Sequence, residues 1–174
     1  MKMKIEDNFL EQGQFDKLQK FICGSEPKLP WFFYPYIVYQ DDVDKFQFVH
    51  SFYRDNSIQT PFLEELFPIL DILRPSAIFR IKANLLTKTS NIVENKFHID
   101  MLDSKDTPEK LKYWSTSIFY VNTNNGYTKF EDGTKVESVA NRMVTFPVNM
   151  KHLGATCTDQ HFRTVINFLY FKNT

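Results

Sequence analysis

The segment Phe97-His98-Ile99-Asp100-Met101 carries two metal-ligating side chains that alternate with apolar ones. On an extended strand, residues i and i+2 point to the same face and lie roughly 7 Å apart. His98 and Asp100 can therefore occupy adjacent positions around one octahedral ion. A second imidazole from another strand would complete a set of two histidines and one carboxylate. Such a set leaves three coordination positions open, which suits non-haem Fe(II) and oxygen chemistry.

Two histidines further along the chain are candidates for the second imidazole. His161 stands two residues before Arg163 and shares its strand face. It is poorly placed to hold a metal while Arg163 reaches across to a distal carboxylate. We therefore select His152 as the ligand and predict that His161 lies at the surface. The fourth histidine, His50, is typical of a buried, hydrogen-bonded core residue, and a position at the substrate entrance is the alternative.

Arg163 follows His152 by eleven residues and stands in an apolar run that extends to Leu169. A guanidinium group in such a run is costly to bury unless an anion pairs with it. The planar fork of arginine matches a carboxylate with two parallel hydrogen bonds. The partner is therefore either a carboxylate of the protein itself or the distal carboxylate of a dicarboxylate co-substrate.

Three further motifs stand in order between Asp100 and His152. They are Ile118-Phe119-Tyr120-Val121-Asn122, Gly126-Tyr127-Thr128-Lys129-Phe130 and Asn141-Arg142-Met143-Val144-Thr145-Phe146-Pro147. H-x-D alone is a weak signal, but the complete ordered series is specific. From about Phe79 to Phe171 the chain resembles the Fe(II)/2-oxoglutarate-dependent oxygenases of the prolyl-hydroxylase-like kind.

The resemblance implies a cofactor, a co-substrate and roles for named residues. Fe(II) would be held by His98, Asp100 and His152, and the distal carboxylate of 2-oxoglutarate would be bound by Arg163 with help from Tyr120. Asn84 falls near a position that often holds a tyrosine in contact with 2-oxoglutarate, so its role stays open. Such enzymes use dioxygen to hydroxylate an unactivated C–H bond of a small-molecule or peptide substrate, and they release succinate and carbon dioxide.

The alternative function is a jelly-roll metal-binding or structural module without turnover. The sequence favours the enzyme, because Arg163 and Tyr120 would have no role in a silent scaffold.

An aromatic run, Trp31-Phe32-Phe33-Tyr34-Pro35-Tyr36-Ile37-Val38-Tyr39, precedes the predicted core strands. Pro35 predicts an edge strand or a bulge there. Trp31, Phe33, Tyr34 and Tyr36 are candidates for an aromatic lip at the substrate entrance, and the alternative is that these rings cap the sheet. Aromatic faces suit a proline ring or an extended peptide, so a prolyl or amino-acid-like substrate is expected.

The hydrophobic periodicity predicts helices first and antiparallel strands afterwards, an α+β and mainly β architecture. The family resemblance sharpens this to a double-stranded β-helix, or jelly roll, whose N-terminal helices brace one sheet. One oxygenase domain is expected over residues 1–174, with supporting strands and helices in 1–75 and the jelly-roll core in 76–174. Helices are predicted over 11–22 and 60–73, strands over 46–53 and 77–86, a polar insertion over 103–112, and short strands from 113 onward.

Charge and composition limit the class of partner. The 174 residues include 21 Lys and Arg and 21 Asp and Glu, so the formal net charge is zero and no nucleic-acid partner is expected. Two cysteines do not suggest a secreted disulfide scaffold. The N-terminus lacks the pattern of a signal peptide, and no apolar run is long enough to span a membrane. A soluble, cytoplasmic protein without a membrane partner is expected.

Overall fold

The computed structural model describes residues 2–41, 44–101, 111 and 113–172, and these residues form two β-sheets and two α-helices. The helical elements are α1 (Gln12–Cys23), the 3-10 helix η1 (Pro61–Leu66) and α2 (Phe67–Leu73). The strands are β1 (Lys4–Glu6), β2 (Phe32–Tyr34), β3 (Gln47–Arg54), β4 (Ser57–Ile58), β5 (Ala77–Thr87), β6 (Trp114–Tyr120), β7 (Tyr127–Phe130), β8 (Lys135–Glu137), β9 (Arg142–Pro147), β10 (His152–Gly154) and β11 (Phe162–Phe171).

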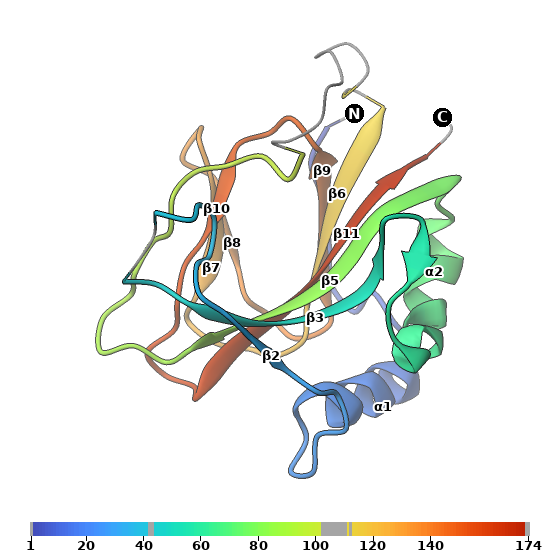
Figure 1. Cartoon of the computed structure of the whole chain (residues 1–174), viewed down its shortest axis with the longest axis horizontal. Helices are drawn as coiled ribbons and strands as arrows, with labels where there is room; N and C mark the ends of the chain where they lie inside the picture. The colour runs from blue at the N-terminus through green and yellow to red at the C-terminus, as the bar shows by residue number, and fades with distance from the viewer. Residues whose placement is uncertain (1, 42–43, 102–110, 112, 173–174) are drawn as a thin grey trace.

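The two sheets face each other, and the helices cover the outer face of the larger sheet (Figure 1). The larger sheet has the order β1-β9-β6-β11-β5-β3-β2, with β4 paired to β3, and the smaller sheet has the order β10-β7-β8. Neighbouring strands in both sheets are antiparallel. This arrangement confirms the predicted jelly roll with N-terminal helices against one sheet.

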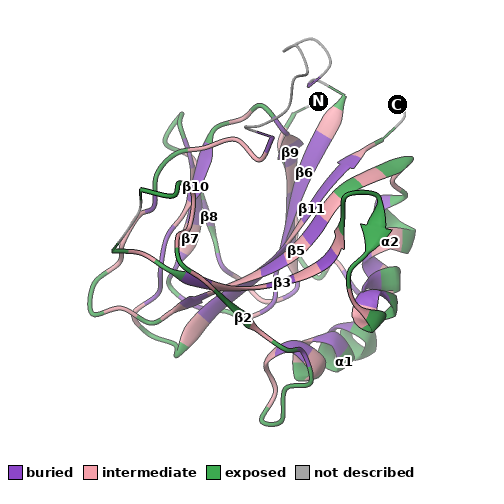
Figure 2. Ribbon diagram, viewed as in Figure 1, coloured by how far each residue is buried: buried purple, intermediate pink, exposed green. Residues whose placement is uncertain are grey.

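The main hydrophobic core lies between the helices and the larger sheet. Buried side chains of the helices meet buried side chains from one face of β3, β5, β6 and β11, and the purple segments of Figure 2 mark them. The helical contribution includes Phe15, Leu18, Ile22, Leu66 and Ile69. Because the outer face of the larger sheet is covered in this way, its inner face is left to line the space between the sheets.

Helix α1 follows the apolar spacing of its sequence. Phe15, Leu18 and Ile22 are buried, and a spacing of three and four residues places them on one helical face. The predicted range, 11–22, differs from the observed one by one residue at each end, because Glu11 serves as the N-cap.

The predicted helix over 60–73 is present but is divided into η1 and α2. Thr60 caps the first part, because its Oγ1 accepts a hydrogen bond from the backbone N–H of Phe62 at 3.4 Å. Pro68 then stands near the start of α2. A proline ring clashes with the carbonyl four residues earlier and offers no N–H, so one continuous α-helix through this position would be disfavoured. The prediction of a single helix is therefore wrong at its centre.

The aromatic run is extended over a shorter stretch than predicted. Only β2, three residues long, forms a strand, and it lies at the edge of the larger sheet, as Pro35 indicates. Trp31 packs against the helix-covered core, so the expectation that it forms part of a substrate lip is wrong. The ring centroids of Tyr34 and Tyr36 lie 4.6 Å apart with the ring planes tilted by 59°, and their hydroxyls hydrogen-bond at 2.7 Å.

His50 lies on the face of β3 that is directed toward the helices. It is buried, its ring packs against Phe52 at 4.8 Å, and its Nδ1 donates a hydrogen bond to the carbonyl of Pro30 at 2.7 Å. A carbonyl can only accept, so the neutral ring carries its proton on Nδ1. This placement agrees with the prediction of a core histidine and not with a position at the substrate entrance.

The N-terminal strands are continuous with the jelly roll. β1 pairs with β9, and β3 pairs with β5, so segments from 1–75 extend the same sheet as segments from 76–174. The predicted insertion over 103–112 lies outside the described residues except for Leu111. None of the helices in the described part of the chain has the length and apolar character needed to cross a membrane.

Candidate metal centre

The two predicted histidine ligands are brought together by an antiparallel bridge. The backbone N–H of His98 donates to the carbonyl of His152 at 2.9 Å, and that of His152 donates to the carbonyl of His98 at 3.0 Å. Directly opposed residues of an antiparallel pair project to the same side, and the ring centroids lie 4.7 Å apart. His98 takes part in this bridge without belonging to a regular strand, which differs from the predicted strand around it.

Asp100 completes a compact cluster of ligand atoms. One ligand atom from each of His98, Asp100 and His152 lies within 4.8 Å of the others. Oδ2 of Asp100 is 3.8 Å from Nε2 of His152, and the side chains of these two residues are 5% and 3% exposed. A half-buried imidazole, a buried imidazole and a carboxylate at this separation form a donor set that fits a transition-metal ion. His161, by contrast, is exposed.

The hydrogen bonds of the imidazoles orient them for metal binding. Nδ1 of His98 lies 3.1 Å from the carbonyl of Lys96, and Nδ1 of His152 lies 3.2 Å from the carbonyl of Met150. Each Nδ1 must donate to its carbonyl, so in both neutral rings Nε2 has the lone pair available to a metal. Burial and the neighbouring His152 lower the pKa of His98, which favours the neutral form that binds metal.

Asp100 is held as a carboxylate by its neighbours. Its Oδ1 accepts from Nη2 of Arg80 at 3.1 Å, and its Oδ2 accepts from Oγ1 of Thr116 at 2.9 Å. Burial raises the pKa of Asp100, but the charges of His152, Arg80 and His98 and the Thr116 hydrogen bond outweigh it, and the pKa falls to about 2. The carboxylate is therefore charged and oriented at neutral pH.

Arg163 lies on β11, away from the cluster of ligand atoms, and is buried. Its Nε donates to Oγ of Ser138 at 2.7 Å, and its Nη2 donates to Oγ1 of Thr128 at 3.1 Å. Tyr120 donates to the same Thr128 oxygen at 2.8 Å, and the guanidinium lies 5.6 Å from the centre of the Tyr120 ring. Burial lowers the pKa of Arg163.

No carboxylate of the described residues lies within ion-pair distance of Arg163. Among the described residues, the acceptors of its hydrogen bonds are neutral hydroxyls, and no acceptor takes the hydrogens of Nη1. Burying a cation with neutral partners alone is unfavourable. The sequence leaves two possible partners for Arg163, a carboxylate of the protein and a carboxylate of a co-substrate. The described residues do not supply the first.

Gly126 makes room for the Arg163 side chain. A Cβ atom at this position would lie 2.7 Å from Cδ of Arg163 and 2.8 Å from the backbone carbonyl of Thr156. Both distances are shorter than real Cβ atoms show. The glycine of the Gly126–Phe130 motif therefore has a steric function beside the arginine.

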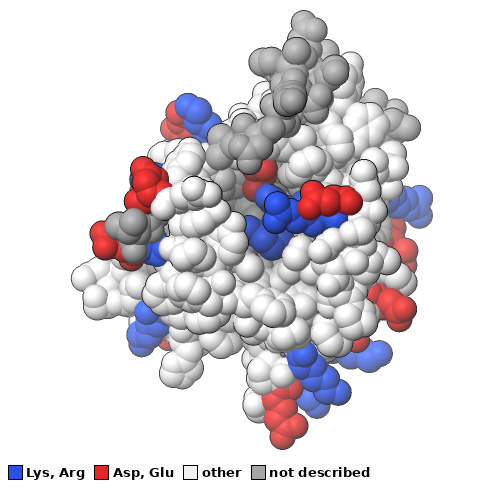
Figure 3. Space-filling model, viewed as in Figure 1, with Lys and Arg blue, Asp and Glu red and all other residues white. Residues whose placement is uncertain are grey.

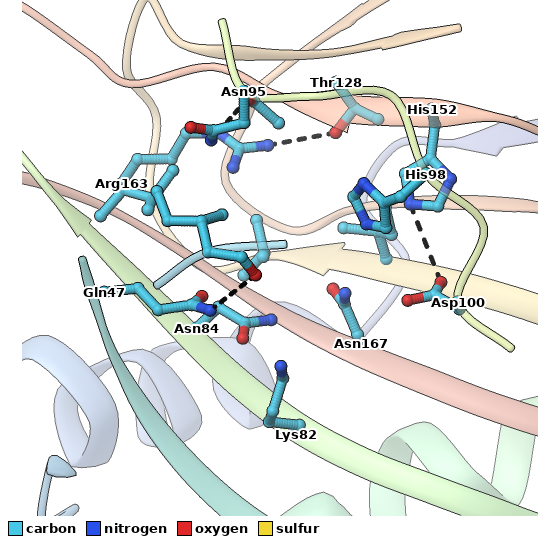
Figure 4. A pocket seen from close by; sticks show the side chains of 15 residues that line it. Gln47, Lys82, Asn84, Asn95, His98, Asp100, Thr128, His152, Arg163 and Asn167 are labelled. Atoms are coloured by element: carbon cyan, nitrogen blue, oxygen red, sulfur yellow. Dashed lines mark hydrogen bonds and ion pairs between the residues drawn. The ribbon is translucent and has the colours of Figure 1, made fainter. Parts of the chain in front are cut away.

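One cavity connects the ligand cluster with Arg163 (Figure 4). Its volume is about 80 Å³, and it lies between the two sheets. The polar side chains that line it are those of Gln47, Lys82, Asn84, Asn95, His98, Asp100, Thr128, His152, Arg163 and Asn167. The close-up shows the triad at one end, Arg163 at the other, and Lys82, Asn84 and Asn167 along the wall between them.

Several cavity residues were not selected from the sequence. Asn95 and Asn167 line the cavity, and their side-chain oxygens, like that of Asn84, find no hydrogen-bond partner among the described residues. The alternation of Arg80, Lys82 and Asn84 on one face of a strand was a visible signal for β5. Asn95 offered no such signal, because it lies in a polar segment without periodicity and is positioned by donating to the carbonyl of Gly154 at 2.8 Å.

Comparison with known proteins shows similarity in structure. No protein-family model matches the sequence, and no curated protein matches it in a sequence search. A collagen prolyl hydroxylase of Paramecium bursaria Chlorella virus 1, solved as a 2-oxoglutarate complex, superposes with a TM-score of 0.63 at 14% identity, over 99% of this chain and 97% of that one.

Two further solved structures are similar over nearly the whole chain. A prolyl hydroxylase of Trichoplax adhaerens, bound to a hypoxia-inducible-factor peptide, has a TM-score of 0.65 at 13% identity, over 97% of this chain and 83% of that one. The non-haem α-ketoglutarate-dependent carbocyclase SnoK of nogalamycin biosynthesis has a TM-score of 0.66 at 10% identity, over 98% and 79%. The resemblance predicted from the sequence is thus confirmed in the fold: the chain has the jelly roll of the prolyl-hydroxylase-like 2-oxoglutarate- and Fe(II)-dependent oxygenases.

Proposed function

We propose that the protein is a non-haem Fe(II)- and 2-oxoglutarate-dependent oxygenase that hydroxylates an unactivated C–H bond. The observation that carries this proposal is the position of the His98–Asp100–His152 cluster and of Arg163 at two ends of one cavity. A metal site alone would suit many functions. A buried arginine without an acidic partner in the described residues adds a place for a carboxylate.

The triad residues fit Fe(II) by their chemistry and orientation. Nε2 of His98, Nε2 of His152 and the carboxylate of Asp100 would hold the ion and leave a face open for further ligands. When bound, the iron would activate dioxygen while 2-oxoglutarate is converted to succinate and carbon dioxide. Arg80 and Thr116 keep the Asp100 carboxylate in place through both of its oxygens.

Arg163 would bind the distal carboxylate of 2-oxoglutarate. Ser138 and Thr128 already hold the guanidinium by Nε and Nη2, so its orientation does not depend on the ligand. Tyr120 supports the site through Thr128 and lies beside the guanidinium. Asn84 lines the same cavity, and we assign its side-chain amide N–H a contact with the co-substrate, whose oxygens only accept hydrogen bonds.

The fold also restricts access of water to the reacting atoms. His152 and Arg163 are buried between the two sheets, His98 and Asp100 are half-buried as residues, and the cavity holds only a few water-sized volumes. A small cavity with many polar side chains in its lining keeps bound groups oriented and strengthens their electrostatic interactions. We assign residues 1–174 to a single oxygenase domain.

The primary substrate we propose is a small molecule or peptide with a prolyl or amino-acid-like group. Tyr34 pairs in register with the cavity residue Gln47, whose amide donates to the carbonyls of Tyr36 and Ile37 at 3.1 Å each. The tyrosine pair therefore borders the cavity and remains a candidate lip. If Tyr36→Ala lowers only substrate-stimulated succinate release and not the uncoupled rate, the lip is supported, and equal loss of both rates contradicts it.

The decisive test of the proposed function is spectroscopic. Anaerobic addition of Fe(II) and 2-oxoglutarate should produce the visible charge-transfer absorption of a metal-chelated keto acid, and admission of oxygen should release succinate. A jelly-roll metal-binding or structural module without turnover would bind metal and stay colourless with 2-oxoglutarate. That outcome would contradict the proposed enzymatic function and support a metal-binding or structural module.

A further inference from the structure

Three cationic side chains gather at one part of the cavity and its surroundings. Lys82 lines the cavity from β5, Arg80 stands two residues before it on the same strand, and Arg54 ends β3 beside them. Figure 3 shows Lys and Arg side chains clustered in the hollow at the centre of this face, with Asp and Glu side chains beside them. We call Arg54, Arg80 and Lys82 the cationic cluster. Because the whole chain has no net charge, this local excess needs an explanation.

The cluster includes two arginines placed directly opposite each other. Arg54 and Arg80 are register partners on β3 and β5, and like charges in such a pair destabilise a sheet. Arg54 has one surface ion pair, with Asp55 at 3.3 Å. Arg80 pairs with Asp100 at 3.1 Å, but its Nε is buried and has no partner among the described residues.

Lys82 adds a third positive charge with no compensation of its own. Across the described residues, its ammonium group takes part in no ion pair or hydrogen bond, although it faces the cavity. The three cations thus share two carboxylates, and one of these, Asp100, belongs to the metal cluster. Burial and the charges of Arg80 and Arg54 lower the pKa of Lys82 to about 8, although Asp100 raises it. A bound anion would offset the repulsion among these positive charges.

The cluster is separate from the place of the distal carboxylate at Arg163. Arg163 is paired with Leu86, whereas Asn167 is paired with Lys82. Along β5, successive residues on one face lie roughly 7 Å apart. Lys82 is therefore two such spacings from Leu86, the partner of Arg163, and Arg80 is three. A five-carbon co-substrate held at one end by Arg163 does not extend to Arg54 and Arg80. The cluster therefore calls for a second anion.

We propose that the primary substrate carries a carboxylate that docks on Arg54, Arg80 and Lys82, next to the metal cluster. This inference rests on the proposed function and adds the substrate class: a carboxylate-bearing, amino-acid-like molecule. Arginine forks match a carboxylate with paired hydrogen bonds, and lysine adds a point charge. Tyr34, which pairs in register with Gln47 of the cavity lining, offers a ring face to the body of the substrate.

The test uses the full chain loaded with Mn(II) and saturating 2-oxoglutarate, without oxygen. The probes are the N-acetyl derivatives of proline, leucine and phenylalanine, each as the free acid and as the carboxamide, and phosphoethanolamine as a phosphate monoester. Paramagnetic broadening of the proton signals of each probe reports binding close to the metal, independently of turnover. The acids should be broadened in a saturable manner, and the amides should not.

Matched variants test which cationic side chains bind the carboxylate of the probes. Lys82→Met and Arg54→Met each remove a cation without touching a metal ligand, and Arg54 is mostly exposed, so the fold should tolerate its loss. Each variant should weaken acid binding about tenfold or more, and Arg54→Met, at a residue outside the cavity lining, should leave 2-oxoglutarate affinity within about twofold. Lys17→Met, an exposed lysine on α1, is the control and should bind the acids like the unaltered chain.

Several results would overturn the proposal. They are equal broadening by amides and acids, no broadening by any carboxylate, binding of the phosphate monoester alone, and a loss of 2-oxoglutarate affinity in Lys82→Met with acid binding intact. The last result would assign Lys82 to the co-substrate. The charge-transfer absorption with Fe(II) and 2-oxoglutarate is measured on the same preparation, so failure of the proposed function is recognised separately.

Discussion

His98 and His152 exchange two backbone hydrogen bonds of 2.9 and 3.0 Å across an antiparallel bridge. Because the two backbones are paired directly, the backbone fixes the separation from which the two imidazoles project. Each ring is further oriented by an Nδ1 hydrogen bond to a carbonyl two residues before it in the chain. The metal site is therefore preorganised by main-chain contacts from two segments that are 54 residues apart.

Metal binding should depend on Asp100 and His152 and not on His161. Asp100→Ala removes the anionic ligand, and His152→Ala removes an imidazole, whereas His161 is exposed. A metal present at 100 times its dissociation constant stabilises a protein by about 2.7 kcal/mol. That stabilisation, measured as the rise in melting temperature on adding Fe(II) without oxygen, should vanish in the first two variants and persist in His161→Ala. Loss of the rise in His161→Ala with its retention in His152→Ala would show a wrong assignment.

Arg163→Lys should weaken 2-oxoglutarate binding and leave metal binding intact. Lysine keeps the charge but loses the planar fork and the hydrogen bonds to Ser138 and Thr128. A hydrogen bond to a charged group is worth about 1.5–3 kcal/mol, so affinity should fall at least about tenfold. Titration of the charge-transfer absorption measures this. An unchanged midpoint would remove Arg163 from the co-substrate site.

Gly126→Ala should disturb the position of Arg163. The added Cβ would lie 2.7 Å from Cδ of Arg163 and 2.8 Å from a backbone carbonyl, and overpacking of this kind costs about 1–3 kcal/mol. Both the free energy of unfolding in urea and the 2-oxoglutarate affinity should decrease. The matched control is Gly13→Ala in helix α1, where no atom lies within 4 Å of the new Cβ. That substitution should stabilise by about 0.4–1 kcal/mol, and destabilisation by both would indicate a general intolerance to alanine.

His50 should make the folded state sensitive to mild acid. Burial lowers the pKa of His50, although the Pro30 hydrogen bond opposes this. The unfolded state, with an ordinary histidine pKa of about 6.5, then binds the proton more readily than the folded state. The contribution of His50 to stability is thus complete above about pH 6.5 and is lost as the pH falls below it.

The measurement compares urea unfolding at pH 7.5 and 5.5 for the unaltered chain and for His50→Phe. Phenylalanine suits the surrounding rings of Phe52 and Phe62 and does not titrate. The decrease in unfolding free energy toward pH 5.5 should be smaller in the variant. Equal decreases in the two proteins would mean that other groups cause the pH dependence.

Much of the site was predictable because its motifs are local. His98 and Asp100 are two residues apart. The ordered motifs up to Arg163 carry the family resemblance that predicts the jelly roll. Helix α1 and the alternation along β5 followed from apolar periodicity, which reflects the burial of one face. The division of the 60–73 helix could have been foreseen from Pro68, which the periodicity alone did not take into account.

The sequence by itself indicated a mainly β architecture, the metal-ligand pair His98 and Asp100 and the need of Arg163 for an anion, because each depends on residue type and short-range spacing. Only the tertiary structure decided that His98 faces His152 and that Arg163 has no acidic partner in the described chain. It also decided that Arg54 stands opposite Arg80 beside Lys82. These relationships depend on strand register and on how two sheets face each other, and register arises from long-range pairing that no local pattern specifies.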